Sequence, residues 1–298
     1  MRGFSYLGAA LALTATSFTP ISASAAEPVV LAPSSPWNLN YADKNCRLSR
    51  VFGEKDNRHM LFFEQAAPGS ARMLVLGGPH IKRFQSKRRA KLQIGDYSQG
   101  ADVTPRIGDL AAVGPALIYP SVGLFEGDLD ESDDPDVVIS RFRTATDPQL
   151  GAGAKFVRVT RGKRVLDFAT DDLAEPLAAL TNCTFDLLSD WGLDPDEHRT
   201  ASRLPVWTNQ PVIARQIQAS YPDRALLAGE QGVIRMRVIV GEDGSVSQCE
   251  LENATETESL DPSACKAMRG AKFEPALNKD GEPMRSYYST SIIYQIGQ

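Results

Sequence analysis

The residues that could do chemistry in this chain are few and widely spaced. The 298-residue sequence contains three histidines, His59, His80 and His198, and four cysteines. Neither a Cys-x-x-Cys pair nor a histidine cluster accompanies the cysteines, which argues against a zinc site. The serine-hydrolase, zinc-protease, P-loop and dinucleotide signatures do not occur in the sequence. We therefore expect no catalytic residue, no metal and no cofactor, and an enzyme in the N-terminal half is the alternative.

Two runs of charge are the other candidates for chemistry. Residues 82–91 (KRFQSKRRAK) hold six basic side chains, and residues 126–136 (EGDLDESDDPD) hold seven acidic ones. The first could bind a polyanion and the second calcium, because hard cations take several oxygen ligands, but the EF-hand spacing is missing. We expect both runs to be solvated hairpin ends. The net charge of -5 argues against a nucleic-acid partner.

The first residues of the chain have the pattern of a cleaved secretory signal. A basic Arg2 precedes an apolar stretch, and the ASA motif at Ala23–Ala25 predicts cleavage after Ala25 or Ala26. A membrane span needs about 20 mostly apolar residues, and Ser, Thr and Pro20 interrupt this stretch too early. We expect residues 1–26 to be removed and the mature chain to be exported and soluble. An anchor that stays uncleaved is the alternative.

The four cysteines are better explained as disulfides. An even number in an exported chain is typical of a disulfide framework, and three pairings are possible. The simplest pairing stays within each half of the chain and joins Cys46 to Cys183 and Cys249 to Cys265. In a chain-entropy model, closing a loop of about 15 residues stabilises the fold by ~3 kcal/mol. Free thiols are the alternative.

Short β-like runs separated by Gly, Pro and Asp predict a mainly antiparallel sandwich or barrel-like sheet in the first half. The runs are residues 59–66, 71–78, 90–96, 116–126, 136–142 and 154–168. One helix is expected after Asp172, which can cap it with Glu175 three residues on. An apolar stripe then follows at Leu173, Leu177, Leu180, Leu187 and Leu188. We expect this domain to span residues 37–191.

Residues 192–211 are rich in Pro, Asp and polar side chains. Their apolar residues follow neither the helical nor the strand period, so we expect a linker there. A second domain over residues 212–298 then has the order helix, strand, strand, helix, strand. Its first helix, residues 223–228, ends at Gly229. Strands over 233–240 and 246–253 flank a turn in which Gly244 can adopt a positive φ.

The second helix of this domain is expected to open at Asp261 and Pro262. The last strand, residues 286–296, has the alternating side-chain pattern of a β-strand. Its members on one side are Tyr288, Thr290, Ile292, Tyr294 and Ile296. The fold class is therefore α+β. The N-terminal domain is mainly antiparallel β with one helix, and the C-terminal domain is a three-stranded antiparallel sheet with two helices.

The C-terminal pattern carries a family resemblance. YPDRALLAGEQGVIRMRVIVGEDGSV has a Tyr-Pro pair, a short helix, a Gly before the first strand and a D-G hairpin. SLDPSACKAMRGAKFEPALNKDGEPM adds a Leu-Asp opening the second helix and an aromatic-x-Pro-Ala after it. From about Ile213 to Ile296, the chain resembles the C-terminal domain of TonB-type energy transducers. The family does not depend on the Cys249–Cys265 pair, and the N-terminal half is not recognised.

The resemblance implies binding rather than catalysis. Members of the family bind a short N-terminal segment of outer-membrane transporters by β-augmentation, near the Tyr-Pro element. Matched by position, the resemblance implies that Gln218, Tyr221 and Pro222 take part in binding the partner. We expect a non-catalytic periplasmic protein, linked to transport, that binds a protein or peptide of the cell envelope. A homodimer is a further possibility.

The last strand is the second candidate contact, because an edge strand carries unpaired backbone groups that can accept an extended peptide. The residues expected to contact the partner are Ser289, Thr290, Ser291 and Ile292. A working TonB-type transducer keeps an inner-membrane helix and a long Pro-rich spacer, whereas this chain has a cleavable signal and a β domain. A membrane-anchored transducer is therefore the alternative to a soluble binding protein.

Overall fold

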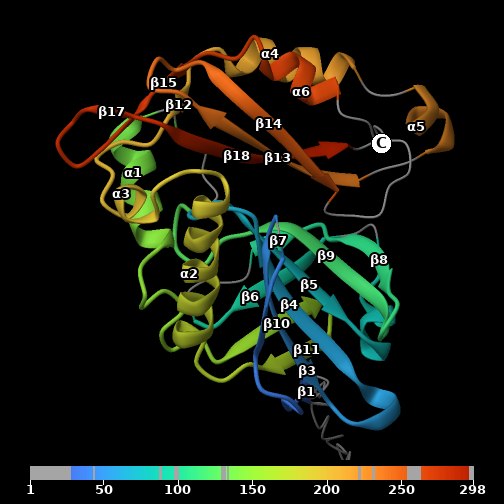
Figure 1. The fold of residues 1–298 in the computed structure, drawn as a ribbon. Coiled ribbons are helices and arrows are strands. Elements are labelled where there is room, and N and C mark those ends of the chain that lie inside the picture. The colour runs from blue at the N-terminus through green and yellow to red at the C-terminus, as the bar shows by residue number, and fades with distance from the viewer. Residues whose placement is uncertain are drawn as a thin grey trace, which may run out of the picture.

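The computed structural model describes residues 28–42, 44–86, 89–96, 101–128, 132, 134–220, 223–229, 232–253 and 263–294. Two sheets form the N-terminal half, and a third sheet with its helices lies against one end of them (Figure 1). The predicted signal, with Ala25 and Ala26, lies outside the described residues. Within the described ranges, no helix has the length and hydrophobicity to cross a membrane.

The larger N-terminal sheet has six antiparallel strands in the order β2-β3-β4-β5-β9-β8. Their bounds are β2 (Asn38–Tyr41), β3 (Cys46–Phe52), β4 (His59–Gln65), β5 (Arg72–Gly77), β8 (Arg106–Leu110) and β9 (Gly114–Val122). Strands β4 and β5 are almost wholly buried, because neighbouring strands flank both of them and both of their faces are covered. The short 3-10 helices η1 (Lys55–Asn57) and η2 (Pro79–Arg83) precede and follow these two strands.

The second N-terminal sheet has five strands in the order β1-β11-β10-β6-β7. Their bounds are β1 (Val29–Leu31), β6 (Ala90–Ile94), β7 (Ala101–Val103), β10 (Phe156–Arg161) and β11 (Arg164–Ala169). Only β1 pairs parallel, with β11. Phe52 of the first sheet packs edge-on against Phe168 of the second, with ring centroids 5.2 Å apart. The predicted antiparallel β structure is confirmed, and residues 154–168 form a hairpin.

Helix α2 (Ala174–Asp190) is the helix predicted from the leucine stripe. Asp172 precedes it, and its two carboxylate oxygens accept hydrogen bonds from the N–H groups of Ala174 and Gly153. The helix packs beside β3, and the predicted disulfide between Cys46 and Cys183 joins the two elements with both cysteines fully buried.

The prediction of one helix in the N-terminal half, and of a strand over residues 136–142, is wrong. Residues Pro135–Ala145 form helix α1. The Asp134 side chain accepts a hydrogen bond from the N–H of Asp136, and Pro135 occupies the first turn, a combination that initiates helices. Ile139 and Phe142 are buried at helical spacing. The acidic run therefore leads into a helix N-terminus instead of ending a hairpin.

The segment predicted as a linker is folded. It contains helix α3 (Pro195–Arg199), strand β12 (Val206–Trp207) and the start of helix α4 (Gln210–Ala219). β12 pairs with β15 (Phe273–Glu274), and Trp207 stacks on Phe273 at 5.8 Å. The polar composition of residues 192–211 favoured a linker, and each helix or strand in this segment is too short to show a hydrophobic period.

The C-terminal sheet has the predicted three antiparallel strands in the order β14-β13-β18. Their bounds are β13 (Gly232–Val240), β14 (Val246–Asn253) and β18 (Ser286–Tyr294). The predicted helices are α5 (Asp223–Ala228) and α6 (Ser263–Met268), and α4 is additional. The turn residue Gly244 has a φ of 77°. A small ribbon of β16 (Ala276–Leu277) and β17 (Pro283–Met284) precedes β18.

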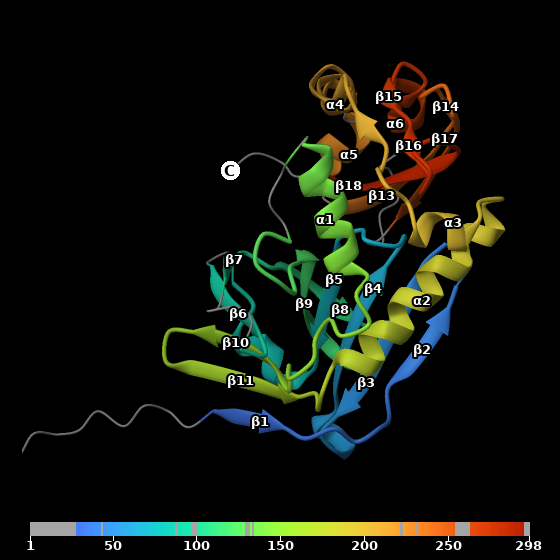
Figure 2. The ribbon, with the colours of Figure 1, turned by 90° about the vertical axis from the view of Figure 1, so that its left-hand side faces the viewer.

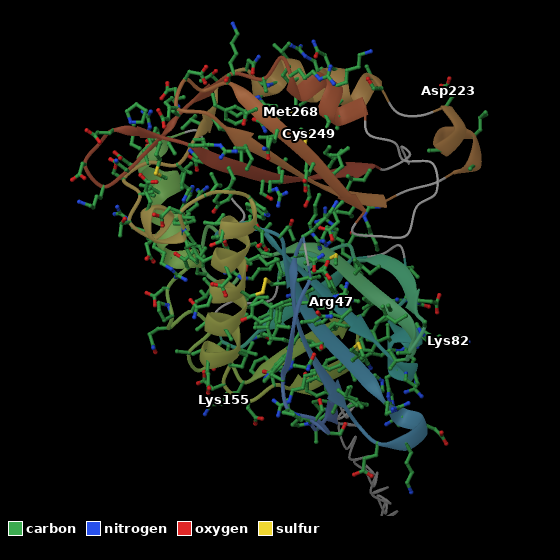
Figure 3. The ribbon with its side chains drawn as sticks, viewed as in Figure 1. Arg47, Lys82, Lys155, Asp223, Cys249 and Met268 are labelled. Atoms are coloured by element: carbon green, nitrogen blue, oxygen red, sulfur yellow. A yellow bond between two sulfur atoms is a disulfide. The ribbon has the colours of Figure 1, made fainter. Side chains whose placement is uncertain are left out.

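Helices α4 and α6 cover one face of this sheet, around a core that includes Ile213, Val238 and Met268 (Figure 1). The predicted disulfide between Cys249 and Cys265 joins β14 to α6 near this core (Figure 3). The opposite face of the sheet turns toward the N-terminal half, where Ile239 and Tyr287 belong to the N-terminal core. The two halves are therefore packed together over a shared apolar surface.

Candidate partner-binding site

Strand β18 is an edge of the C-terminal sheet, because among the described strands it pairs with β13 alone. The hydrogen bonds of β13 show which way the backbone of β18 points. The N–H of Gly241 donates to the Ser245 carbonyl at 2.8 Å, and the Ile239 carbonyl accepts from Ser247 Oγ at 3.2 Å. Odd-numbered residues of β13 therefore direct their backbone groups toward β14, and even-numbered residues direct theirs toward β18.

The same alternation applies to β18. Met236 lies opposite Thr290, and Ile234 lies opposite Ile292. Because even-numbered residues of β13 face β18, the backbone groups of Thr290 and Ile292 point inward to the sheet. Those of Ser289 and Ser291 then point to the outer edge, where an additional strand would pair.

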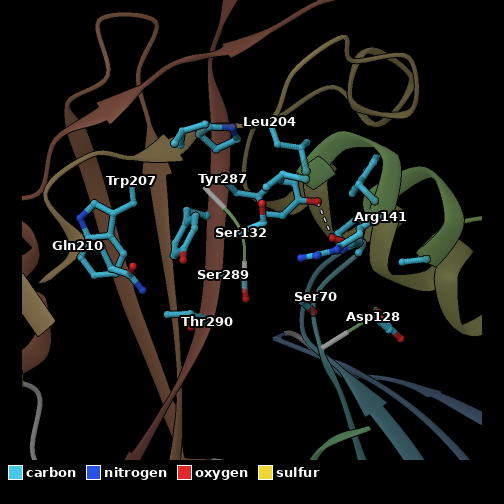
Figure 4. Close-up of a pocket in the computed structure, with 18 residues that line it drawn as sticks. Ser70, Asp128, Ser132, Arg141, Leu204, Trp207, Gln210, Tyr287, Ser289 and Thr290 are labelled. Atoms are coloured by element: carbon cyan, nitrogen blue, oxygen red, sulfur yellow. Dashed lines mark hydrogen bonds between the residues drawn. The ribbon is translucent and has the colours of Figure 1, made fainter. Parts of the chain in front are cut away.

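A cavity of about 620 Å³ lies beside this edge. Its lining comes from both halves of the chain, and Figure 4 shows β18 on one side and α1 on the other. From the C-terminal half it is lined by Leu204, Pro205, Val206, Trp207, Gln210, Tyr287, Tyr288, Ser289 and Thr290. From the N-terminal half it is lined by Pro68, Gly69, Ser70, Asp128, Ser132, Val138, Arg141, Phe142 and Ala145. Its size is that of a typical ligand site.

Tyr287 lines the cavity and links the two halves of the chain. Its hydroxyl donates a hydrogen bond to the Pro68 carbonyl at 2.8 Å, drawn as a dashed line in Figure 4. Its ring stacks on His198 at 5.6 Å and meets the edge of Trp191 at 5.7 Å. Burial raises the pKa of Tyr287, so the hydroxyl stays protonated and keeps donating.

An acidic and a basic side chain lie close together beside the cavity. The Asp128 carboxylate accepts from the Leu124 N–H at 2.8 Å and lies 4.0 Å from the buried Arg72 guanidinium. Burial raises the pKa of Asp128 and lowers that of Arg72 to about 10. Arg72 also donates to the Ala145 carbonyl at 2.5 Å, which holds the last turn of α1 in place.

The predicted contact residues are only partly brought together. Ser289 and Thr290 line the cavity, and Ser291 and Ile292 continue the same strand. Gln218 is exposed on α4 and is not part of the cavity lining, and Tyr221 and Pro222 lie outside the described residues. No pattern in the sequence indicated that α1 and the turn at Pro68–Ser70 lie across the cavity from β18.

Two of the three histidines, His59 and His198, are buried. His59 is fully buried, its Nδ1 donates to the Asn57 carbonyl, and its Nε2 accepts from the His80 N–H. His198 Nε2 lies 3.2 Å from Ser286 Oγ, a pairing that could activate a serine. Both residues are almost fully buried, so a substrate could not reach the hydroxyl. Within the described part of the chain, no group of three or more His, Cys, Asp or Glu is placed to hold a metal ion.

Among the described strands, none pairs with the outer edge of β18. Residues 217–296 match the family model described as the C-terminal of the Gram-negative bacterial TonB protein. This part of the chain is therefore similar to a TonB C-terminal domain, and the match does not reach the N-terminal half. No curated protein matches the chain.

Proposed function

We propose that this chain is a non-catalytic protein of the periplasm that binds an extended segment of an envelope protein on the outer edge of β18. An outer-membrane transporter is the first class of partner to test, because the C-terminal domain is of the TonB type. The observation that supports the proposal best is the cavity beside an unpaired strand edge. An added strand would gain backbone hydrogen bonds there without any reactive side chain.

The covered face of the sheet favours the edge as the binding surface. Glu64 of β4 forms an ion pair with Arg235 of β13, and Arg237 lies over the Trp191 ring at 3.8 Å. These contacts occupy the face opposite α4 and α6. A partner that reaches this sheet would therefore meet the β14 edge, the β18 edge or the helices before it meets the remaining face, and of the two edges β18 lines the cavity.

The test is a proline substitution at an outward-facing position. Ser291→Pro removes an N–H that β13 does not use, and an edge strand tolerates proline at such a position. Binding of synthetic peptides that represent the N-terminal segments of outer-membrane transporters should fall at least about tenfold, a loss of ~1.4 kcal/mol. Ser291→Ala is the matched control and should bind as the unchanged protein does.

Two further results decide the interpretation. Circular dichroism and the thermal midpoint should show that Ser291→Pro is folded. Ser289→Pro offers a second outward position if it is not. Full-strength binding by a folded proline variant at both positions would overturn the proposal and direct attention to Gln218 on α4.

A further inference from the structure

The β18 edge does not face open solvent along its whole length. Helix α1 lies close to β18 in Figure 2, and residues of both elements line the cavity. Val138, Arg141 and Phe142 of α1 line the cavity opposite Ser289 and Thr290. A strand added to β18 would therefore have protein on both sides, and one side would belong to the half of the chain that the TonB match does not cover.

We propose that α1 and the turn at Pro68–Ser70 form a second wall of the partner groove. The occupant is an extended peptide that inserts a large apolar side chain, aromatic or aliphatic, into the cavity opposite Ser289. This inference rests on the proposed function and adds the chemistry of the partner to it. The N-terminal half then takes part in choosing the partner.

The apolar side chains of the cavity lining favour an apolar guest. Val138 and Phe142 of α1, and Trp207 and Tyr288 of the C-terminal half, all line the cavity. The described charged side chains of the lining, Asp128 and Arg141, are of opposite sign and attract each other. An apolar guest would gain from burial against the apolar part of the lining.

The contact between Tyr287 and Pro68 limits where a bound peptide strand can start along β18. Tyr287 and Pro68 are joined by a hydrogen bond, so the two halves touch at that point. The next outward-facing residue of β18 is Ser289, which lines the cavity. A bound strand would start opposite Ser289 and continue toward Ser291, about 6.6 Å further along at strand spacing.

The second wall is held firmly enough to discriminate between guests. Gly69 has a φ of +67°, and a Cβ placed on it would lie 2.4 Å from the Phe142 ring, so the turn and α1 are in tight contact. Arg72 fixes the C-terminal turn of α1 through the Ala145 carbonyl. Pre-organised walls lower the ordering cost of binding and sharpen shape selection.

Two neighbouring valines on α1 provide a matched test. Val138 lines the cavity, whereas Val137 lies on the same helix, is exposed and is absent from the lining. Val138→Trp should fill part of the cavity and weaken binding of the transporter-segment peptides by at least about tenfold, which is comparable with the burial of one apolar side chain. Val137→Trp should change affinity less than about twofold. Val138→Phe replaces Val138→Trp if the larger ring prevents folding.

A second measurement identifies the guest side chain. Each apolar residue of a bound peptide is changed in turn to Ala, Asp or Lys, and one position should lose affinity with all three changes in the unchanged protein. That loss should be smaller with the Val138→Trp protein, in which the introduced ring already occupies part of the cavity.

Equal binding by Val138→Trp and Val137→Trp, together with a loss in Ser291→Pro, would overturn the second wall and leave β18 pairing standing. Preference for Asp or Lys at the sensitive position would also overturn it. Undiminished binding by the folded proline variants would instead remove the proposed function itself.

Discussion

Glu64 and Arg235 lie 171 positions apart in the sequence, yet Glu64 Oε1 and Arg235 Nη2 are 2.5 Å apart between the two halves of the molecule. Their side chains are only 1% and 9% exposed. Arg47 pairs with the same carboxylate, and Glu252 with the same guanidinium. Asn45 donates to Glu252. This network fixes β4 against β13 and so holds the groove walls at their spacing.

Removing one partner of this pair should be costly. Arg235→Met leaves Glu64 buried with only the half-exposed Arg47, and the free energy of unfolding should fall by about 3–5 kcal/mol. Urea unfolding measures this. Glu64→Gln combined with Arg235→Met should recover part of the loss, because no unpaired buried charge remains. Lys279→Met, in an exposed pair with Asp280, is the control and should cost under about 1 kcal/mol. A loss that small for Arg235→Met would show that the network does not join the halves.

The Cys249–Cys265 disulfide should stabilise the C-terminal domain without taking part in binding. It closes a short loop, with a sequence separation of 16, between β14 and α6 on the side of the sheet away from β18. Replacing both cysteines by serine should lower the free energy of unfolding by about 2–4 kcal/mol. Peptide affinity of the folded variant, measured by titration calorimetry, should stay within about twofold. A larger change in affinity would place β14 or α6 in the site.

The stability of the fold should fall as pH drops through the range in which histidine titrates. Burial lowers the pKa of His198 below its usual 6.5, so the unfolded chain binds a proton more readily than the folded one. The stabilising contribution is complete above pH 6.5 and is lost as pH falls toward the folded pKa. His198→Gln should unfold more easily at pH 7.5 but lose less stability between pH 7 and pH 5. A variant whose pH dependence equals that of the unchanged chain would exclude His198 as a source of this loss.

Local patterns in the sequence predicted the elements that carry their own signals. The leucine stripe of α2, the D-G turn at Gly244 and the alternation of β18 needed no distant contact to be recognised. The three helices that were not predicted share one feature at their N-termini. Helices α1, α3 and α4 each have Pro in the first turn, and the first two have an Asp cap. In α1 the β-branched residues Val137, Val138 and Ile139 favoured a strand and outweighed that cap.

The groove could not be predicted because it depends on which segments meet across the two halves. Nothing near Val138 or Phe142 in the sequence indicates that α1 faces β18 from more than 140 positions away. The Tyr287 hydroxyl bonds to Pro68 across a separation of 219 residues. Contacts of this kind follow from the packing of the sheets, whereas periodicity and capping report only on neighbours along the chain.

The central claim is that a partner strand pairs with the outer edge of β18, and amide hydrogen exchange measured by NMR tests it residue by residue. In the free protein the Thr290 amide should exchange slowly, because it faces β13, and the amides of Ser289 and Ser291 should exchange quickly. A saturating transporter-segment peptide should slow Ser289 and Ser291 by at least about tenfold and leave Thr290 slow. Unchanged exchange at Ser289 and Ser291 while the peptide is bound would contradict the account and place the partner elsewhere on the molecule.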